Sequence, residues 1–240
     1  MTYRLYYWPT IQGRGEFVRL ALEAAGAKYV DVAREPRAGG VKALTDLLAD
    51  RKQLYRPFAP PILQSGKLLI AQTANILLYL GDKHGLAPKT EAGRLWAHQL
   101  QLTVADFVDE AHNTHHPIAS GLYYEDQKKE AKRYAGEFLK ARVPKFLAYF
   151  ESVLAAGPSR GKHLIGRSLS YPDLSVFQIT AGLRYAFPNA MKPLAAKYPL
   201  VAALHDRVAA YPPIRAYLAS PRRIPFNNQG IYRHYPELDV

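Results

Sequence analysis

Three histidines in the middle of the chain stand at a spacing that could hold a metal ion. His112, His115 and His116 fall at i, i+3 and i+4, so a helix would carry all three on one side. Asp109 lies one turn before His112, and imidazole is a common ligand of Zn²⁺. The same three rings could instead line a polar pocket without a metal.

A second group of polar residues stands where a helix is expected to begin. Gln72 and Thr73 directly precede Ala74, Leu77 and Leu78, which recur at helical spacing. The first N–H groups of a helix have no partner within it, and the helix dipole favours a negative charge at that end. This helix start is therefore a candidate site for a carboxylate, although Thr73 could equally serve as an ordinary N-cap.

The 240 residues contain no cysteine. This absence excludes a disulfide framework, a cysteine zinc site, a CxxC redox pair and a thiol nucleophile. With 48% of residues hydrophobic, the chain can bury a substantial core, as one large domain or two small ones. No apolar run reaches the roughly 18 residues of a membrane span, and the N-terminus lacks the pattern of a signal peptide. We therefore expect a cytoplasmic protein without a membrane partner.

The chain is basic, with 32 Lys and Arg against 20 Asp and Glu and a formal charge of +12. Residues 1–85 hold 12 basic and 7 acidic side chains, and residues 86–240 hold 20 and 13, so the excess is spread over both halves. The densest basic run, in residues 128–145, is typical of a solvated helix face. A general positive field of this kind favours an anionic small molecule over nucleic acid as the partner.

The first 85 residues alternate between short strands and amphipathic helices. Tyr3–Trp8 is rich in aromatic residues and predicts a strand, from which Tyr6 and Tyr7 would point to opposite faces. Ser65-Gly66 between two apolar runs predicts a tight hairpin. The other expected elements are a helix up to Gly26, a strand at residues 29–32, a helix at 41–48 and a helix from 73 to 84.

Beyond a proline-marked boundary at residues 86–90, the pattern is helical throughout. Ser170 and Asp173 form a capping box with Pro172 in the first turn, which predicts the start of a buried central helix. The tail from Pro221 to Val240 is expected to wrap the surface as coil. The expected helices cover residues 91–117, 125–156, 172–187 and 193–219.

This pattern predicts a small α/β domain, residues 1–85, followed by an all-α domain, residues 86–240. Several of its features together resemble the cytosolic glutathione S-transferases. The similarity covers nearly the whole chain and is carried by Tyr7-Trp8-Pro9, Gly13-Arg14, Pro60-Pro61, Gln72-Thr73 and the capping box. It implies a thioredoxin-like domain that binds glutathione as co-substrate, a helical domain that completes a pocket for a hydrophobic electrophile, and a homodimer.

The resemblance implies that the protein converts the thiol of glutathione to a thiolate. A free thiol has a pKa of about 8.5, and lowering it by about two units takes roughly 2.7 kcal/mol of preferential thiolate stabilisation. Without cysteine, the donor to the sulfur must be a hydroxyl. The similarity to the tyrosine-type classes, such as pi, mu and sigma, selects Tyr7; the alternatives are Thr10, Tyr6 or no protein donor at all.

The resemblance also assigns residues to the rest of glutathione. Gln72 and Thr73 would hold the γ-glutamyl carboxylate, and Arg14 would line the site or stabilise the dimer. Asp106, 34 residues after Gln72, would reach across the dimer to the γ-glutamyl amine. Three basic side chains could bind the glycyl carboxylate: Lys52, which we favour, Arg51 and Lys42.

Pro61 aligns with the cis-proline of the family. In the family, the residue before this proline forms backbone hydrogen bonds to the cysteinyl part of glutathione. Here that residue is Pro60, which has no N–H to donate. The departure slightly favours a rival function, a non-catalytic ligand-binding or assembly module with the same fold.

In the family fold, the histidine segment lines the electrophile pocket or the cleft between subunits. We therefore expect no metal at the three histidines and assign His112, His116 and Tyr123 to that pocket. The sequence does not identify the electrophile, because the pocket depends on how distant segments fold over the first domain.

Overall fold

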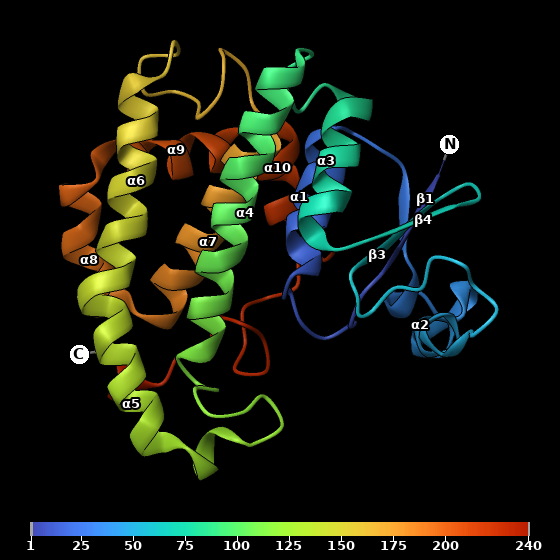
Figure 1. The fold of residues 1–240 in the computed structure, drawn as a ribbon, viewed down its shortest axis with the longest axis horizontal. Coiled ribbons are helices and arrows are strands. Elements are labelled where there is room, and N and C mark those ends of the chain that lie inside the picture. Colours follow the sequence, from blue (N-terminus) through green and yellow to red (C-terminus); the bar gives the residue numbers. More distant parts are fainter. Residues whose placement is uncertain (1, 240) are drawn as a thin grey trace.

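The computed structural model describes residues 2–239, and it combines a small sheet at one end with a larger bundle of helices (Figure 1). The sheet and its helices come from the first part of the chain, and the bundle follows. The predicted fold class, an α/β thioredoxin-like part followed by an all-α part, is confirmed. No helix in residues 2–239 is both long and apolar enough to cross a membrane.

The sheet has four strands in the order β2-β1-β3-β4. They are β1 (Tyr3–Tyr6), β2 (Tyr29–Asp31), β3 (Ile62–Ser65) and β4 (Leu68–Ala71). Strand β1 is central: it pairs in parallel with β2 and antiparallel with β3, which in turn pairs antiparallel with β4. The predicted hairpin at Ser65-Gly66 joins β3 to β4, and Gly66 takes the positive φ of 62° that the tight turn requires.

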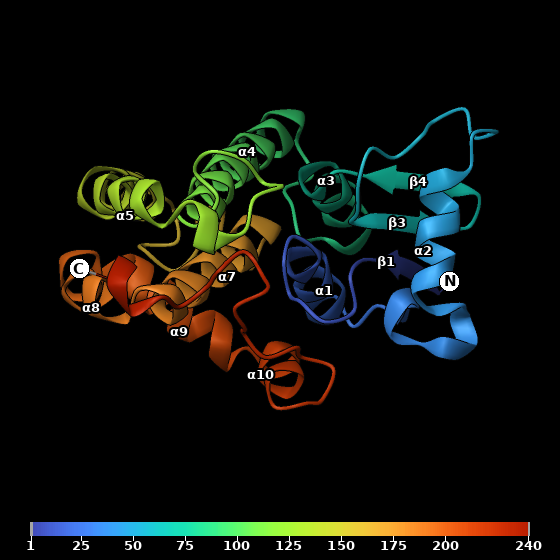
Figure 2. The same ribbon diagram turned by 90° about the horizontal axis from the view of Figure 1, so that it is seen from below.

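Helices cover both faces of the sheet. Figure 2 shows α1 (Gly15–Ala24) and α3 (Thr73–His84) on one side of the strands and α2 (Gly40–Ala49) on the other. Successive side chains of β1 point to opposite faces of the sheet, because side chains alternate along a strand. Leu5 belongs to the main core, whereas Tyr6 packs in a separate small cluster with α2.

The helical part contains seven α-helices between Glu91 and Leu218. They are α4 (Glu91–Asn113), α5 (Lys128–Glu137), α6 (Val143–Ala156), α7 (Tyr171–Ala186), α8 (Pro188–Lys197), α9 (Pro199–Ala210) and α10 (Pro212–Leu218). A π-helical turn at Phe138–Arg142 joins α5 to α6, so the predicted helix over residues 125–156 is one long element with a wide turn inside it.

The predicted single helix over residues 193–219 is wrong, because this segment contributes to three helices. Helices α8, α9 and α10 begin at Pro188, Pro199 and Pro212. A proline is tolerated in the first turn of a helix but interrupts a helix that reaches it from the N-terminal side, because it has no N–H to donate. The residues before these prolines accordingly leave the helical conformation; Tyr211, for example, has a ψ of 124°.

The tail after α10 is mainly coil, as predicted, but it does not simply wrap the surface. Ile224, Ile231, Tyr232 and Leu238 are each at most 6% exposed. The tail runs from α10 past α1 and α7 (Figure 2), and the ring of Tyr232 lies so close to Gly182 of α7 that a Cβ there would come within 2.4 Å of it. The tail is therefore part of the core that it was expected to cover.

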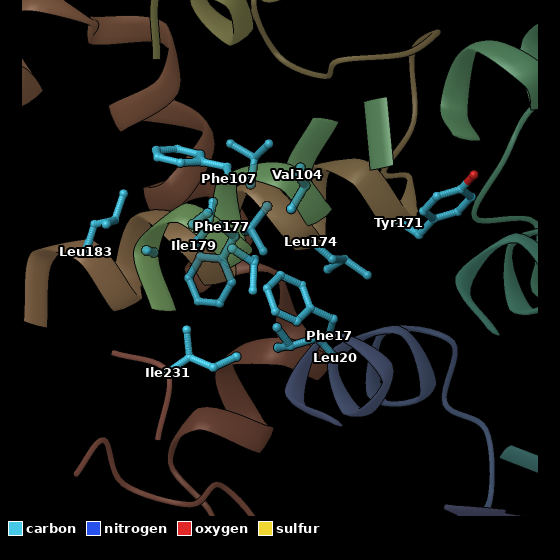
Figure 3. Close-up of a cluster of buried hydrophobic side chains, with 14 of the residues drawn as sticks. Phe17, Leu20, Val104, Phe107, Tyr171, Leu174, Phe177, Ile179, Leu183 and Ile231 are labelled. Atoms are coloured by element: carbon cyan, nitrogen blue, oxygen red, sulfur yellow. The ribbon is translucent and has the colours of Figure 1, made fainter. Parts of the chain in front are cut away.

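One hydrophobic core joins the two parts of the chain. Phe17 and Leu20 of α1 face Leu174 and Phe177 of α7, and Phe107 of α4 lies in the same cluster (Figure 3). Helix α7 is almost entirely buried, which confirms it as the central helix.

The predicted capping box at the start of α7 is confirmed. Asp173 is fully buried, and its carboxylate accepts hydrogen bonds from Ser170 N–H (2.8 Å), Ser170 Oγ (2.7 Å) and Leu164 N–H (2.8 Å). It therefore fixes both the start of the helix and the loop that leads to it.

Replacing Asp173 with Ala leaves these donors buried without an acceptor, and we expect a loss of about 3 kcal/mol in the free energy of unfolding. Urea denaturation followed by far-ultraviolet circular dichroism measures it. The matched control is Thr90→Ala, which removes the exposed N-cap of α4 and should cost about 1 kcal/mol. Equal losses for the two variants would contradict this role of Asp173.

Candidate functional site

The hydroxyl of Tyr7 lies at the start of α1. Tyr7 follows β1 directly, and its Oη accepts a hydrogen bond of 2.8 Å from the backbone N–H of Arg14. Two glycines make room for the ring: a Cβ at Gly13 would lie 2.0 Å from Tyr7 Oη, and one at Gly15 would lie 2.5 Å from Tyr7 Cγ. The glycines of this turn are therefore needed to admit the tyrosine.

Tyr7 is 5% exposed, and this burial raises the pKa of its phenol above the ordinary value. The bond from Arg14 and the charges of Arg14 and Arg19 oppose the rise in pKa. The guanidinium carbon of Arg19 lies 5.7 Å from the centre of the Tyr7 ring. Tyr7 is thus a neutral phenol whose oxygen already accepts one hydrogen bond and whose own proton is free to be donated.

A cavity of about 330 Å³ lies between α1, α3 and α4. Its lining includes the polar residues Arg14, Gln72 and Thr73 and the apolar residues Phe17 and Leu102. The other lining residues are Ala74, Asn75, His98, Gln101, Ala105 and Val108. The cavity therefore offers a cation and a helix N-terminus beside an apolar surface.

The start of α3 has two unusual features. Gln72 has a φ of 68°, in the left-handed region that non-glycine residues rarely adopt, which costs of order 1–3 kcal/mol. The hydroxyl of Thr73 is buried and has no hydrogen-bond partner within residues 2–239. A strained backbone and an unpaired hydroxyl at one helix N-terminus are the arrangement expected of a site that awaits a hydrogen-bonding ligand.

The other predicted glutathione-binding residues do not line this cavity. The Pro60–Pro61 peptide is cis, as the resemblance implied, and it leads directly into β3. Lys52 is exposed on the loop before it. Asp106 is exposed on α4, and on the next turn Asp109 forms an ion pair of 3.1 Å with Arg14.

The three histidines do lie together, at the C-terminal end of α4. Their ring centres are 4.7–5.1 Å apart, in stacked and edge-on pairs. His115 Nε2 lies 2.7 Å from the carbonyl of Ile231 in the tail, so it is this nitrogen that donates. Within residues 2–239, no group of three His, Cys, Asp or Glu residues has the geometry to hold a metal ion.

Burial is the largest cause of the low basicity of these rings. It lowers the pKa of His112 to about 4 and that of His115 to about 2, and the positive charge of Arg233 contributes to both. Both rings are therefore neutral at pH 7 and serve as polar but uncharged surface.

The predicted electrophile pocket is only partly assembled. His112 and His116 are adjacent, but Tyr123 is 78% exposed. None of the three lines the cavity of about 330 Å³. The assignment of these residues to a pocket stays a prediction.

Sequence reasoning missed the α4 wall of the cavity. Gln101, Ala105 and Val108 recur at helical spacing, which predicts one helix face but not which helix it opposes. It also missed Arg19, whose guanidinium approaches Tyr7, because a charged residue within an apolar helix pattern gives no indication of its burial partner.

Comparison with known proteins gives consistent results. Residues 112–221 match the family model described as glutathione S-transferase, C-terminal domain. The chain is 26% identical over 223 residues to a glutathione S-transferase of Plasmodium falciparum, covering 90% of this chain and 94% of that protein. It is 29% identical over 222 residues to glutathione S-transferase P 1 of Xenopus laevis, covering 92% and 93%.

Solved structures share the fold. A Pi-class glutathione S-transferase of Onchocerca volvulus superposes with a TM-score of 0.70 at 24% identity, over 91% of this chain and 92% of that one. A monomeric glutathione S-transferase of the hookworm Necator americanus gives 0.73 at 21% identity, over 94% and 100%.

Replacing Gly13 with Ala places a methyl group against Tyr7 Oη, and we expect a loss of stability well above that of Gly26→Ala. Both glycines have a positive φ, 47° and 60°, but a Cβ at Gly26 meets nothing within 4 Å. The difference between the two urea midpoints therefore isolates the contact with Tyr7. Equal urea midpoints would show that the turn accommodates the new methyl group without displacing the Tyr7 ring.

Acid should weaken the fold through His115. Because folding lowers its pKa from 6.5 to about 2, the unfolded chain binds a proton between these pH values that the folded chain does not. The stability that the neutral ring contributes is complete above pH 6.5 and falls as the pH decreases, by about 1.4 kcal/mol per pH unit for this one group.

The measurement is the free energy of unfolding at several pH values between 6.5 and 4.5, for the unmodified chain and for His115→Gln. The variant retains an N–H donor for the Ile231 carbonyl but does not titrate, so its stability should depend less steeply on pH. Parallel pH profiles would contradict the assignment.

Proposed function

This chain belongs to the cytosolic glutathione S-transferase family, and from that premise we propose that it activates the thiol of bound glutathione for attack on a hydrophobic electrophile. In this proposal, residues 1–85 bind glutathione and residues 86–240 complete the electrophile site. The observation that carries it is the start of α3, where the strained Gln72 and Thr73, whose buried hydroxyl is unpaired, line the same cavity as Arg14.

Tyr7 is the proposed donor to the sulfur. Its phenol is neutral, and the Arg14 N–H occupies a lone pair of its oxygen, which leaves the O–H free for a thiolate. A hydrogen bond from a neutral donor favours the charged form of the thiol and so lowers its pKa. The thiol proton goes to solvent, and the thiolate then forms a carbon–sulfur bond with the electrophile. In an addition the displaced electron pair of the electrophile takes up a proton, and in a substitution, as with 1-chloro-2,4-dinitrobenzene, chloride leaves.

The ends of glutathione are assigned as follows. The Thr73 hydroxyl, the free N–H groups of α3 and the Gln72 side chain hold the γ-glutamyl carboxylate. Arg14 adds a positive charge at this end of the cavity, while Lys52 binds the glycyl carboxylate. In a homodimer, Asp106 of the other subunit binds the γ-glutamyl amine, which agrees with its exposure on α4.

Pro60 and Pro61 border the cysteinyl part of glutathione. Pro60 can offer its carbonyl but no N–H, so one backbone donor of the family is missing here. Lowering the thiol pKa then depends more strongly on Tyr7.

On the electrophile side we retain His112, His116 and Tyr123, together with the tail that contacts His115. A cytoplasmic enzyme that detoxifies apolar electrophiles by conjugation fits this combination of an anion site and an apolar wall. The missing Pro60 donor is the one feature that suits a non-catalytic module, and the relatives, all named as transferases, do not favour that alternative.

Two variants test the assignment of roles. Tyr7→Phe should lower kcat for conjugation by about 100-fold, the equivalent of two units of thiol pKa, while the Kd for glutathione changes less than threefold. Thr73→Val should do the reverse, raising Kd by at least tenfold because a carboxylate loses a buried hydrogen bond.

Calorimetric titration with glutathione measures Kd, and initial rates with 1-chloro-2,4-dinitrobenzene measure kcat. Unchanged turnover in Tyr7→Phe would reject the tyrosine mechanism. No binding of millimolar glutathione by the unmodified protein would favour the non-catalytic module.

A further inference from the structure

A group of charged side chains lies beneath Tyr7, fully removed from solvent. Glu16 and Arg19 of α1 are both 0% exposed, and Arg19 Nη1 lies 3.2 Å from Glu16 Oε2. Arg19 Nε donates to Asp31 Oδ2 at 2.7 Å. Arg19 is therefore shared between two carboxylates, of which Asp31 has a second cation in Arg34, with Nη1 3.8 Å from Asp31 Oδ2.

The second cation for Glu16 comes from a distant part of the chain. Arg223 in the tail donates to Glu16 Oε1, and the Tyr217 hydroxyl of α10 donates to the same oxygen at 2.6 Å. The Arg223 side chain is only 10% exposed. Glu16 thus has three donors, and two of them lie about 200 residues away in the sequence.

A parallel set of hydrogen bonds holds the turn between β1 and α1. The Gln12 side chain donates to the Ile224 carbonyl at 2.5 Å and accepts from Gln178 Nε2 at 2.8 Å. Gln178 Oε1 in turn accepts from Arg223 Nη2 at 3.0 Å. The guanidinium of Arg223 therefore reaches both the buried carboxylate and the turn.

This turn determines where the Tyr7 hydroxyl lies. The Gln12 carbonyl accepts from Arg19 Nη1 (3.3 Å) and from Glu16 N–H (3.0 Å). Two residues further on, the Arg14 N–H binds Tyr7 Oη at 2.8 Å. A shift of Gln12 therefore moves the donor that orients the phenol.

The positive charge of Arg223 favours thiol activation at Tyr7, as its hydrogen bonds do. The cations that face Tyr7 are Arg14, from the start of α1, and Arg19, beneath the ring. Asp31 has a second cation in Arg34, whose Nη1 lies 3.8 Å from Asp31 Oδ2. Removing Arg223 therefore makes the cluster beneath the phenol less positive, and a less positive cluster stabilises a second anion, the thiolate, at the Tyr7 hydroxyl less well.

We propose that Arg223 is a positioning residue for thiol activation: acting through Glu16 and, by way of Gln178, through Gln12, it orients the Tyr7 hydroxyl and adds positive charge beneath it. This inference rests on the proposed function of Tyr7. It makes Arg223 a residue that assists thiol activation without touching substrate.

The test compares Arg223→Gln with Arg222→Gln. Arg222 is the neighbouring tail arginine, 56% exposed and bound to Glu23, so its loss controls for a general effect on the tail. Two measurements are made on each variant: the pH dependence of kcat/KM for conjugation, and hydrogen exchange of the Arg14 amide by NMR without glutathione.

In Arg223→Gln we expect the pH profile to move to higher pH by about one unit, a tenfold loss at acidic pH, with the Kd for glutathione within twofold. The Arg14 amide should exchange at least tenfold faster. Arg223→Lys, which keeps the charge but not the two-armed guanidinium, should recover part of the pH shift. Arg222→Gln should behave as the unmodified protein.

Identical behaviour of Arg223→Gln and Arg222→Gln in both measurements would overturn the inference. If Arg223→Gln does not fold, Tyr217→Phe replaces it, since it removes only one hydroxyl donor to Glu16; it should shift the pH profile in the same direction, and an unchanged profile would overturn the inference. If the unmodified protein does not bind glutathione, the proposed function fails, and exchange at Arg14 alone decides whether Arg223 positions the turn.

Discussion

The carboxylate of Glu16 is fully removed from water, and a charge in that position costs several kcal/mol unless it is paired and hydrogen-bonded. Its partners come from three places: Arg19 on the same helix, Tyr217 on α10 and Arg223 in the tail. The rest of the structure has to satisfy this requirement. The tail must return to α1, and α10 must lie against it, because no solvent is available to replace them.

Helix α1 consequently carries three kinds of contact at once. Phe17 and Leu20 belong to the core shared with α7 (Figure 3). Glu16 and Arg19 belong to the buried charge cluster, and the first turn supplies the Arg14 N–H that holds Tyr7. Because these contacts lie within one and a half turns of helix, the position of Tyr7 depends on packing and charge in the helical part of the chain as well as on the sheet.

Local patterns in the sequence predicted the features that depend on neighbouring residues. The hairpin at Ser65-Gly66, the capping box of Ser170 and Asp173, and the helix that starts after Gln72 are all determined by a few consecutive side chains. The breaks at Pro199 and Pro212 were missed although their signal is equally local, because helical periodicity continues across both prolines.

What the sequence could not predict are contacts between distant residues. The partners Glu16 and Arg223 are 207 positions apart, and neither position looks unusual in its own segment: Glu16 stands in the first turn of a helix, where acidic residues are common, and Arg223 stands in a basic tail. The burial of Ile231 and Tyr232 could not be predicted either, because the apolar residues of the tail form no periodic pattern. The sequence predicts the residues of the α4 cavity wall as one helix face, but it does not predict that this face lies opposite α1 and α3.

The long reach of the Glu16 contact also constrains how the protein is made. During synthesis, Glu16 leaves the ribosome long before Arg223 exists. At about 5–20 residues per second, the 207 intervening residues take roughly 10–40 s. Through that interval α1 cannot bury its charged face, so the sheet and its helices remain an incomplete unit. The turn that holds Tyr7 therefore gains its full set of contacts only after Arg223 has been made, although the residues of the turn itself are made early.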